Sequence, residues 1–345
     1  MVENAPYIGI DLGGTGFRVY EVNPSTGKLL KNYSPDIELK DVKSNEHLTD
    51  IIRKSLPTGK RLNIGTTSSG AINKYSLIVK GSPNLPIKGE ITFARDLRED
   101  GNDVAIDNDI NVALMGAVIY GQARGLSNVL MATYSSGFNC AKSVDEVVTT
   151  EAEFGHMPYQ RGAGIFCGCG GVDHLETHIS GNGAAARAKE YFIMTNQKSH
   201  PILDKALNDL NTREGTSYDP NDLKNNNELR NQVIMSITAK HIYQTFKEDP
   251  ESNPQKSIQK HQVEAIADSL GMMFAANRPL ELMILMGSQA EKDWPTLFKP
   301  ALDLIEENPE NYSLPFLTFP KVVKSELEEA GVVGSVANLI QQQSG

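Results

Sequence analysis

The 345-residue sequence lacks long apolar runs, has three cysteines, and has fewer basic than acidic residues. No stretch approaches the roughly 18 consecutive apolar residues that a membrane helix needs. Residues 1–6 contain no basic region followed by an apolar one, which argues against a secretory signal. We therefore expect a cytoplasmic protein with no membrane partner.

The shortage of positive charge argues against a nucleic-acid partner. The sequence has 33 Lys and Arg residues against 43 Asp and Glu residues, a formal net charge of −10. The basic residues are scattered, whereas binding to a phosphate backbone needs them clustered. The charged share of 22% and the hydrophobic share of 39% are ordinary for a globular protein, and the length suggests two domains.

The three cysteines are too few for a disulfide framework. Cys167 and Cys169 are also too close in sequence for an unstrained bridge, which favours reduced thiols. Cys140 is expected to be a small buried apolar residue.

Four metal-ligand side chains lie in one short segment: His156, Cys167, Cys169 and His174. Two thiolates and two imidazoles are a typical zinc set. The alternative is that two incidental cysteines lie in a glycine-rich loop. The carboxylate of Glu153 comes just before this segment.

A glycine turn follows the apolar strand expected at residues 7–10. Gly13, Gly14 and Thr15 let backbone N–H groups and a hydroxyl approach phosphate oxygens without a Cβ in the way. Asp11 at the end of the strand could hold Mg²⁺ directly or through water. The alternative is an ordinary hairpin turn, and the segment is neither a Walker A loop nor a dinucleotide fingerprint.

A second polar turn, Asp107-Asn108-Asp109, follows the short strand expected at 104–106 and precedes a helix. Phosphoryl transfer to an alcohol needs a carboxylate that orients the hydroxyl and accepts its proton, and Asp109 fits that role. The alternative is that Asp109 is a helix N-cap, a position where Asp is among the preferred residues.

In their order and spacing, the turn at residues 11–15, the turn at 107–111 and the Cys/His segment resemble the ROK family. This family contains sugar kinases and sugar-responsive repressors of the actin-like ATPase superfamily. The resemblance runs from about residue 7 to the C-terminus and is thinnest between about 190 and 260. It implies an α/β, two-lobed actin-like ATPase (ribonuclease H-like) fold with a central mixed sheet in each lobe. Residues 1–113 with about 328–345 would form a small lobe, and 114–327 a large lobe with the zinc loop and nucleotide contacts.

The resemblance also implies roles for single residues. Gly13, Gly14 and Thr15 match the first phosphate loop, Ser136 and Gly137 the second, and Gly287 and Ser288 the adenosine contact. The sugar would contact Gly70, Asn84, Asn108, Asp109, Glu153, His156 and Glu176. In the second loop Asn139 replaces a glycine, and His174 stands where the family generally has a third cysteine ligand. The polar region 195–258 is expected to form surface helices and loops without chemistry, with one helix across 229–246.

The function implied is ATP-dependent phosphorylation of a hexose, with Mg²⁺ at the phosphates and structural Zn²⁺. Glucose phosphorylated at the 6-hydroxyl is the first choice, and N-acetylmannosamine or N-acetylglucosamine is the alternative. A homodimer is implied by the family. A repressor is disfavoured because ROK repressors carry a helix-turn-helix domain before the strand equivalent to 7–10, which only six residues precede. A third hypothesis, prompted by the altered second loop, is a sugar-binding protein with weak catalysis.

Overall fold

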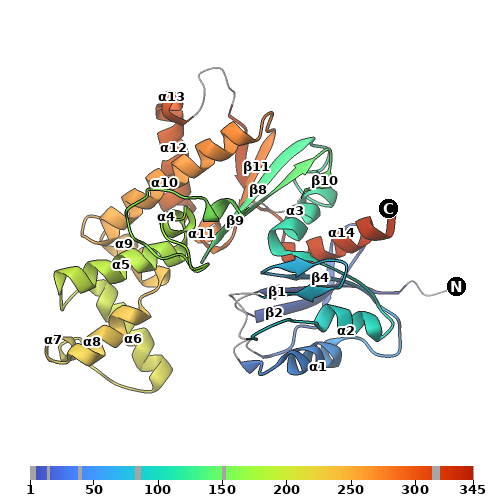
Figure 1. Ribbon diagram of the computed structural model, residues 1–345, viewed down its shortest axis with the longest axis horizontal. Helices are drawn as coiled ribbons and strands as arrows, with labels where there is room; N and C mark the ends of the chain where they lie inside the picture. Colours follow the sequence, from blue (N-terminus) through green and yellow to red (C-terminus); the bar gives the residue numbers. More distant parts are fainter. Residues whose placement is uncertain are drawn as a thin grey trace.

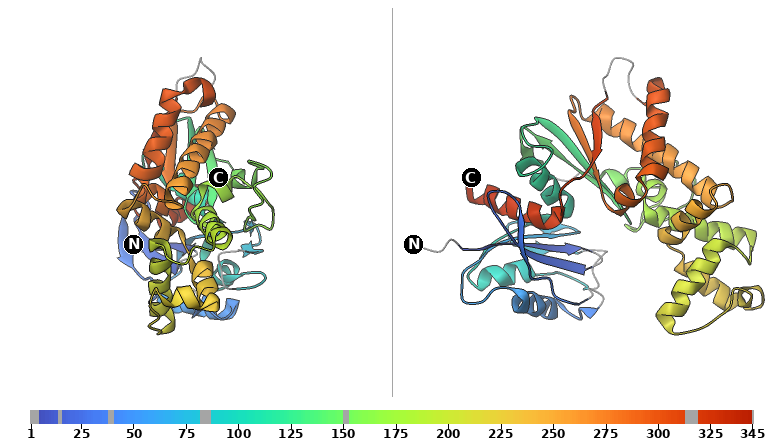
Figure 2. Two further views of the ribbon diagram at one scale, coloured as in Figure 1. Left: turned by 90° about the vertical axis from the view of Figure 1, so that its left-hand side faces the viewer. Right: turned by 180° about the vertical axis from the view of Figure 1, so that it is seen from behind.

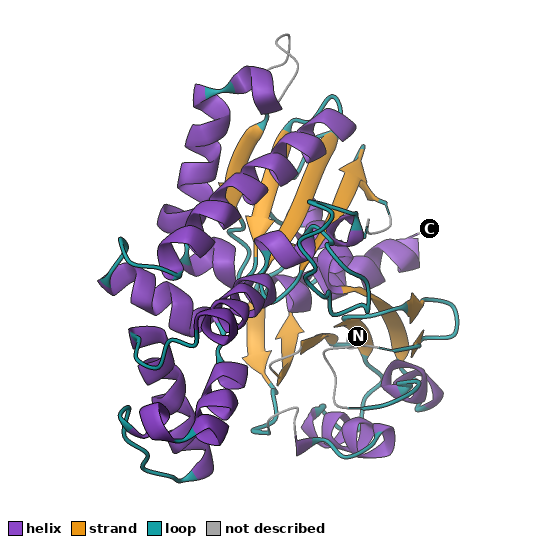
Figure 3. Cartoon of the chain, turned by 60° about the vertical axis from the view of Figure 1, so that its left-hand side comes forward, coloured by secondary structure: helices purple, strands orange, loops and turns teal. Residues whose placement is uncertain are grey.

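The computed structural model describes residues 5–13, 16–37, 41–81, 87–149, 153–312 and 319–344, and these form two five-stranded sheets with helices around them (Figures 1 and 3). Both sheets contain parallel and antiparallel strand pairs. This arrangement confirms the predicted α/β class with a mixed sheet in each of two parts of the chain.

The first sheet has the order β3-β2-β1-β4-β7. Its strands are β1 (Tyr7–Gly13), β2 (Gly16–Val22), β3 (Leu29–Asn32), β4 (Asn63–Ser68) and β7 (Asp103–Asn108). Strands β1, β4 and β7 are parallel, and β2 pairs antiparallel with β1 and β3. A two-stranded hairpin, β5 (Ile72–Asn73) and β6 (Ile78–Val79), follows β4.

The alternating side chains of β1 face two different layers. Ile8, Ile10 and Leu12 are buried against α1 (Asn45–Ser55) and α2 (Phe93–Glu99). On the opposite face α14 (Ala330–Ser344) approaches so closely that only glycine fits. A Cβ on Gly9 would lie 2.3 Å from the Val332 carbonyl oxygen, and one on Gly65 would lie 2.0 Å from that of Ser335.

The second sheet has the order β10-β9-β8-β11-β12. Its strands are β8 (Asn128–Tyr134), β9 (Phe138–Val144), β10 (Val147–Val148), β11 (Leu282–Met286) and β12 (Lys321–Lys324). Both faces of β8 are buried, which explains its nearly continuous apolar sequence. One face packs on α3 (Asp109–Ile119) and the other on the helices of the large core.

Helices α3 and α14 pack on each other and lie between the two sheets (Figure 1; Figure 2, right). Gly334 of α14 permits this contact, since a Cβ there would lie 1.7 Å from the Val112 carbonyl oxygen. Helix α3 runs through the boundary expected between residues 113 and 114, and the division into lobes at these residues stays a prediction.

The remaining helices belong to the part of the chain with the second sheet. They are η2 (Phe154–His156), α4 (Glu176–Ile179), α5 (Gly181–Thr195), α6 (Pro201–Glu214), α7 (Asp222–Asn225), α8 (Asn227–Ser236), α9 (Ala239–Glu248), α10 (Gln255–Ala276), α11 (Ser288–Lys292), η3 (Trp294–Phe298), α12 (Lys299–Glu307) and α13 (Pro309–Tyr312). The single helix expected across 229–246 is wrong: α8 ends at Ser236, and Thr238 begins α9 as its N-cap. Among the described residues, no helix is long and apolar enough to cross a membrane.

Candidate functional site

The parallel strands of the first sheet bring three of the expected segments to one edge. Leu12 pairs with Ser68, and Ser68 pairs with Asn108, so β1, β4 and β7 end side by side. Asp11, Gly70 and Asp109 therefore lie at or just beyond the same carboxyl edge. The expected contacts Gly14, Thr15 and Asn84 lie outside the described residues.

Asp11 is held by an arginine that the sequence analysis missed. Arg18 Nη1 donates to Asp11 Oδ2 at 3.1 Å, and Arg18 Nε lies 3.2 Å from Glu329 Oε2, just before α14. Burial raises the pKa of Asp11, and Arg18 opposes that rise. The sequence could have indicated this ion pair, because a hairpin of β1 and β2 places residue 11 directly opposite residue 18.

Asn108, and not Asp109, is the N-cap of α3. The Asn108 side chain accepts from the Ile110 N–H at 3.2 Å, and Asp109 is the first residue of the helix. Asp109 Oδ1 also accepts from the Ile110 N–H, at 2.8 Å. The N-cap interpretation of Asp109 is therefore wrong, since the neighbouring asparagine has that position.

Two turns of the second sheet also lie side by side. Ser136 and Gly137 connect β8 to β9, and Gly287 connects β11 to α11. Strands β8 and β11 are parallel, with Thr133 opposite Met286. Gly287 has φ 92° and ψ 165° and caps α11, and a Cβ there would lie 2.5 Å from the Tyr134 carbonyl oxygen.

A cavity of about 540 Å³ opens beside these two turns. It is lined by Ser135, Ser136, Gly181, Asn182, Thr238, Ala239, Lys240, Tyr243, Gln244, Lys247, Ser288, Gln289, Lys292 and Asp293. Ser136 and Ser288 are two of the residues expected to contact the nucleotide. Six of the other lining residues, 238–240, 243, 244 and 247, come from α9 and its N-cap, so part of the region 195–258 lines this cavity.

Charged and polar side chains are fixed at the wall formed by α9 and α11. Lys247 Nζ lies 3.2 Å from Asp293 Oδ1. Burial raises the pKa of Asp293, and Lys247 opposes that rise. Gln289 Nε2 donates to the Tyr243 hydroxyl at 2.7 Å, and Tyr243 donates to Gln262 Oε1 at 2.9 Å. No local pattern in the sequence indicates this wall, because α9 and α11 are far apart in the chain.

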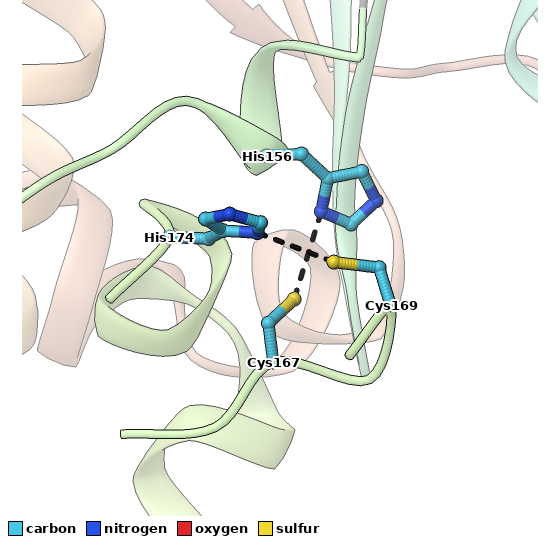
Figure 4. A group of neighbouring side chains, drawn as sticks. All are labelled: His156, Cys167, Cys169 and His174. Carbon is cyan, nitrogen blue, oxygen red and sulfur yellow. Dashed lines mark hydrogen bonds between the residues drawn. The ribbon is translucent and has the colours of Figure 1, made fainter. Parts of the chain in front are cut away.

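The four predicted metal ligands come together (Figure 4). One ligand atom from each of His156, Cys167, Cys169 and His174 lies within 4.8 Å of the others. Cys167 Sγ is 3.6 Å from His156 Nδ1, and Cys169 Sγ is 3.3 Å from His174 Nδ1. Burial raises the pKa of the Cys167 thiol to about 12, so a bound cation would be needed to keep it as a thiolate.

Backbone contacts give the loop that carries these ligands its shape. The Cys167 N–H donates to the Gly171 carbonyl at 2.8 Å, and the Gly170 N–H to the Cys167 carbonyl at 3.0 Å. The Asp173 carboxylate accepts from the N–H groups of Gly162, at 2.7 Å, and Ile165, at 2.9 Å. Asp173 has φ 57°, and its carboxylate links the backbone of residues 162–165 to the segment just before His174.

Two carboxylates flank the cysteine and histidine cluster. Glu153 Oε2 lies 3.5 Å from His156 Nε2. Glu176, the first residue of α4, accepts from the Phe138 N–H at 2.9 Å and lies 3.5 Å from Cys167 Sγ. Glu176 therefore joins the cluster to the Ser136–Gly137 turn, and three of the expected sugar contacts (Glu153, His156 and Glu176) are neighbours.

Comparison with known proteins gives a family match over nearly the whole chain. The sequence model of the ROK family matches residues 7–337. Glucokinase of Thermotoga maritima is 29% identical over 50% of this chain, and the match spans 56% of the length of that protein. Glucokinase of Halalkalibacterium halodurans is 24% identical over 90% of this chain and 86% of its own.

Solved structures match along the chain at low identity. A ROK family glucokinase from Streptomyces griseus, in complex with glucose and AMPPNP, is 19% identical with a TM-score of 0.69, covering 98% of this chain and 100% of its own. A ROK family transcriptional regulator, a homologue of the E. coli MLC protein, is 16% identical with a TM-score of 0.69, covering 97% of this chain and 78% of its own. At these identities the likeness establishes the fold alone. The chain belongs to the ROK family and has its two-lobed actin-like ATPase fold.

Proposed function

We propose that the protein is an ATP-dependent sugar kinase that phosphorylates a hexose. The observation that carries this proposal is the position of Asp109 at the edge where β1, β4 and β7 end. The preceding residue, Asn108, caps α3, so the Asp109 side chain is not needed as the N-cap. A carboxylate at such a junction can face a bound alcohol. The glucokinases that match the chain support the same activity.

In this proposal Asp109 orients the acceptor hydroxyl and takes its proton as the oxygen bonds to phosphorus. Asn108 would hydrogen-bond a neighbouring hydroxyl, and Gly70 and Asn84 would contact the sugar. Glu153, His156 and Glu176 bind further hydroxyls, because each buried sugar hydroxyl needs a hydrogen-bond partner.

ATP would bind in the cavity of about 540 Å³, with its adenosine near Gly287 and Ser288 and its phosphates near Ser136 and Gly137. The turn Gly13-Gly14-Thr15 would face the phosphates from the other lobe. Mg²⁺ would be held near Asp11, where it neutralises phosphate charge when bound. Asp11 has one oxygen engaged by Arg18, so the ion and Arg18 would share this carboxylate.

The cluster of His156, Cys167, Cys169 and His174 would hold structural Zn²⁺. In a tetrahedral site with two sulfur and two nitrogen ligands, neighbouring ligand atoms are roughly 3.3–3.8 Å apart. The Cys–His separations of 3.6 and 3.3 Å fit this geometry. The ion would fix the loop that presents Glu153, His156 and Glu176.

Glucose phosphorylated at the 6-hydroxyl is the preferred substrate and reaction, and N-acetylmannosamine or N-acetylglucosamine is the alternative. The same hydrogen-bonding residues serve either class, and pocket volume decides between them. A homodimer, a cytoplasmic location and the lobe boundaries at 113/114 and about 327/328 are part of the same proposal.

The test is release of ADP from Mg-ATP, coupled to NADH oxidation, across hexoses, N-acetylhexosamines and polyols. Sugar-dependent turnover, fastest with glucose and yielding glucose 6-phosphate, is expected. Faster turnover of an N-acetylhexosamine would favour the alternative substrate. Binding of sugar without turnover on any member of the panel would reject the kinase in favour of a sugar-binding or repressor-type protein.

A further inference from the structure

The loop after β4 carries a lysine that reaches the turn holding Asp109. Gly70, with φ 105°, leads into the β5–β6 hairpin, and Lys74 lies in the hairpin turn. The Lys74 Nζ is 2.6 Å from Asp107 Oδ2. This ion pair joins two segments of the proposed sugar site, the loop from Gly70 to the hairpin and the end of β7.

Asp107, near the end of β7, forms several hydrogen bonds. Its Oδ1 accepts from the Asn108 N–H at 2.7 Å and from Asn111 Nδ2 at 3.0 Å. The Thr67 hydroxyl donates to its carbonyl at 3.0 Å. The carboxylate therefore holds the backbone of Asn108, whose side chain caps α3, and the next residue is Asp109.

The ion pair of Lys74 and Asp107 is partly buried, which distinguishes it from an ordinary surface ion pair. The Asp107 side chain is 10% exposed, whereas that of Lys74 is 39% exposed. Exposed ion pairs contribute little to stability. Removing the cation beside a nearly buried carboxylate is more costly, because the carboxylate charge then lacks a partner of opposite charge. If Lys74 were replaced, Asp107 Oδ1 would keep its two N–H donors, but Asp107 Oδ2 would lose its cation.

We propose that Lys74 is a positioning residue for the acceptor hydroxyl. Through Asp107 it fixes the Asn108–Asp109 turn and holds the hairpin after Gly70 against it. The inference rests on the proposed function, because it assigns Lys74 to the same acceptor site. Its effect is transmitted through Asp107, so it calls for no contact between Lys74 and the sugar.

The experiment compares Lys74→Met with Lys74→Arg and with a control ion pair in the same lobe. Arg53 Nε lies 2.7 Å from Asp100 Oδ2, an exposed pair between α1 and the end of α2, and Arg53→Met removes it. The KM for the sugar, the KM for ATP, kcat and hydrogen–deuterium exchange of the Asn108 amide are measured in each variant. The exchange measurement requires no turnover, so it still tests the inference if the wild-type protein phosphorylates no sugar and the proposed function fails.

We expect Lys74→Met to lower kcat/KM for the sugar roughly tenfold, equivalent to about 1.4 kcal/mol. KM for ATP should stay within about twofold, and exchange of the Asn108 amide should accelerate. Lys74→Arg should keep kcat/KM for the sugar and the exchange rate of the Asn108 amide close to wild type. Arg53→Met should change neither of these two quantities. In the background of Asp107→Asn, Lys74→Met should have little further effect. Equal behaviour of Lys74→Met and Arg53→Met in both readouts would overturn the proposal, as would an undiminished Lys74→Met effect in the Asp107→Asn background.

Discussion

Replacing Gly287 with alanine should distort the turn that presents Ser288 to the proposed nucleotide cavity. The backbone at φ 92° and ψ 165° lies in a region that residues with a Cβ rarely occupy, which costs about 1–3 kcal/mol. The new Cβ would also lie 2.5 Å from the Tyr134 carbonyl oxygen and 2.9 Å from Thr133 Oγ1. Because Tyr134 contributes backbone from the central strand β8, it cannot move aside cheaply. We expect a loss of about 3–4 kcal/mol in unfolding free energy, within the range of severe single substitutions.

Gly59→Ala is the matched control. Gly59 also has a positive φ, of 77°, but an added Cβ there would have no atom of a described residue within 4 Å. Gly59→Ala should lower the unfolding free energy only by the cost of placing a Cβ at positive φ, about 1–2 kcal/mol. Urea denaturation gives both free energies, and calorimetry with the non-hydrolysable analogue AMPPNP gives the nucleotide affinity. Gly287→Ala should be the less stable variant and the only one with weaker AMPPNP binding; equal unfolding midpoints and equal affinities would refute the reasoning.

Gly137→Ala should behave differently from Gly287→Ala, because within the described part of the chain the atoms that lie within 4 Å of its new Cβ belong to the Glu176 carboxyl group, with Oε2 at 2.7 Å. Stability should change by less than about 1 kcal/mol, while sugar KM should rise as Glu176 is displaced; a normal sugar KM would show that Glu176 does not contact the sugar. For the metal, protein purified without chelator should contain about one zinc per chain by elemental analysis, and Cys169→Ser should lower that content and the melting temperature; a metal-free wild type of full stability would contradict the site. The melting temperature should also fall between pH 7 and pH 5. Burial, with the nearby Arg187 cation, lowers the pKa of His178 and of His261 to about 4 from the usual 6.5. The unfolded chain therefore binds protons in this window that the folded chain does not, and stability is lost as pH falls through it, by at most about 1.4 kcal/mol per pH unit for each histidine. His261→Gln should flatten this dependence, and an unchanged slope of melting temperature against pH would refute it.

The sequence predicts the parts of the fold that depend on local patterns. The strands expected at residues 7–10 and 104–106 lie within β1 and β7, because each is a short apolar run that ends at a polar turn. The Cys/His cluster was also predictable, since its ligands lie in one short segment that a few backbone hydrogen bonds can fold.

What the sequence could not supply depends on packing between distant segments. Lys240, Tyr243 and Lys247 reach the cavity only because α9 packs beside α5 and α10, and a polar helical sequence does not reveal its neighbours. The ion pair of Lys74 with Asp107 likewise depends on how the β5–β6 hairpin lies on the end of β7. Composition suggested a surface region at 195–258, but buried residues such as Leu207 and Val233 place its helices on the large core.

The assignment of Asp109 as the group that takes the proton is tested most directly by Asp109→Asn. The amide keeps the size of the side chain and can still hydrogen-bond a hydroxyl, but it does not accept the proton. With the preferred sugar and saturating Mg-ATP, the rate of ADP release should fall by about 10²–10⁴-fold, while calorimetry should find sugar affinity within a few-fold of wild type. A variant that turns over at the wild-type rate would contradict the account.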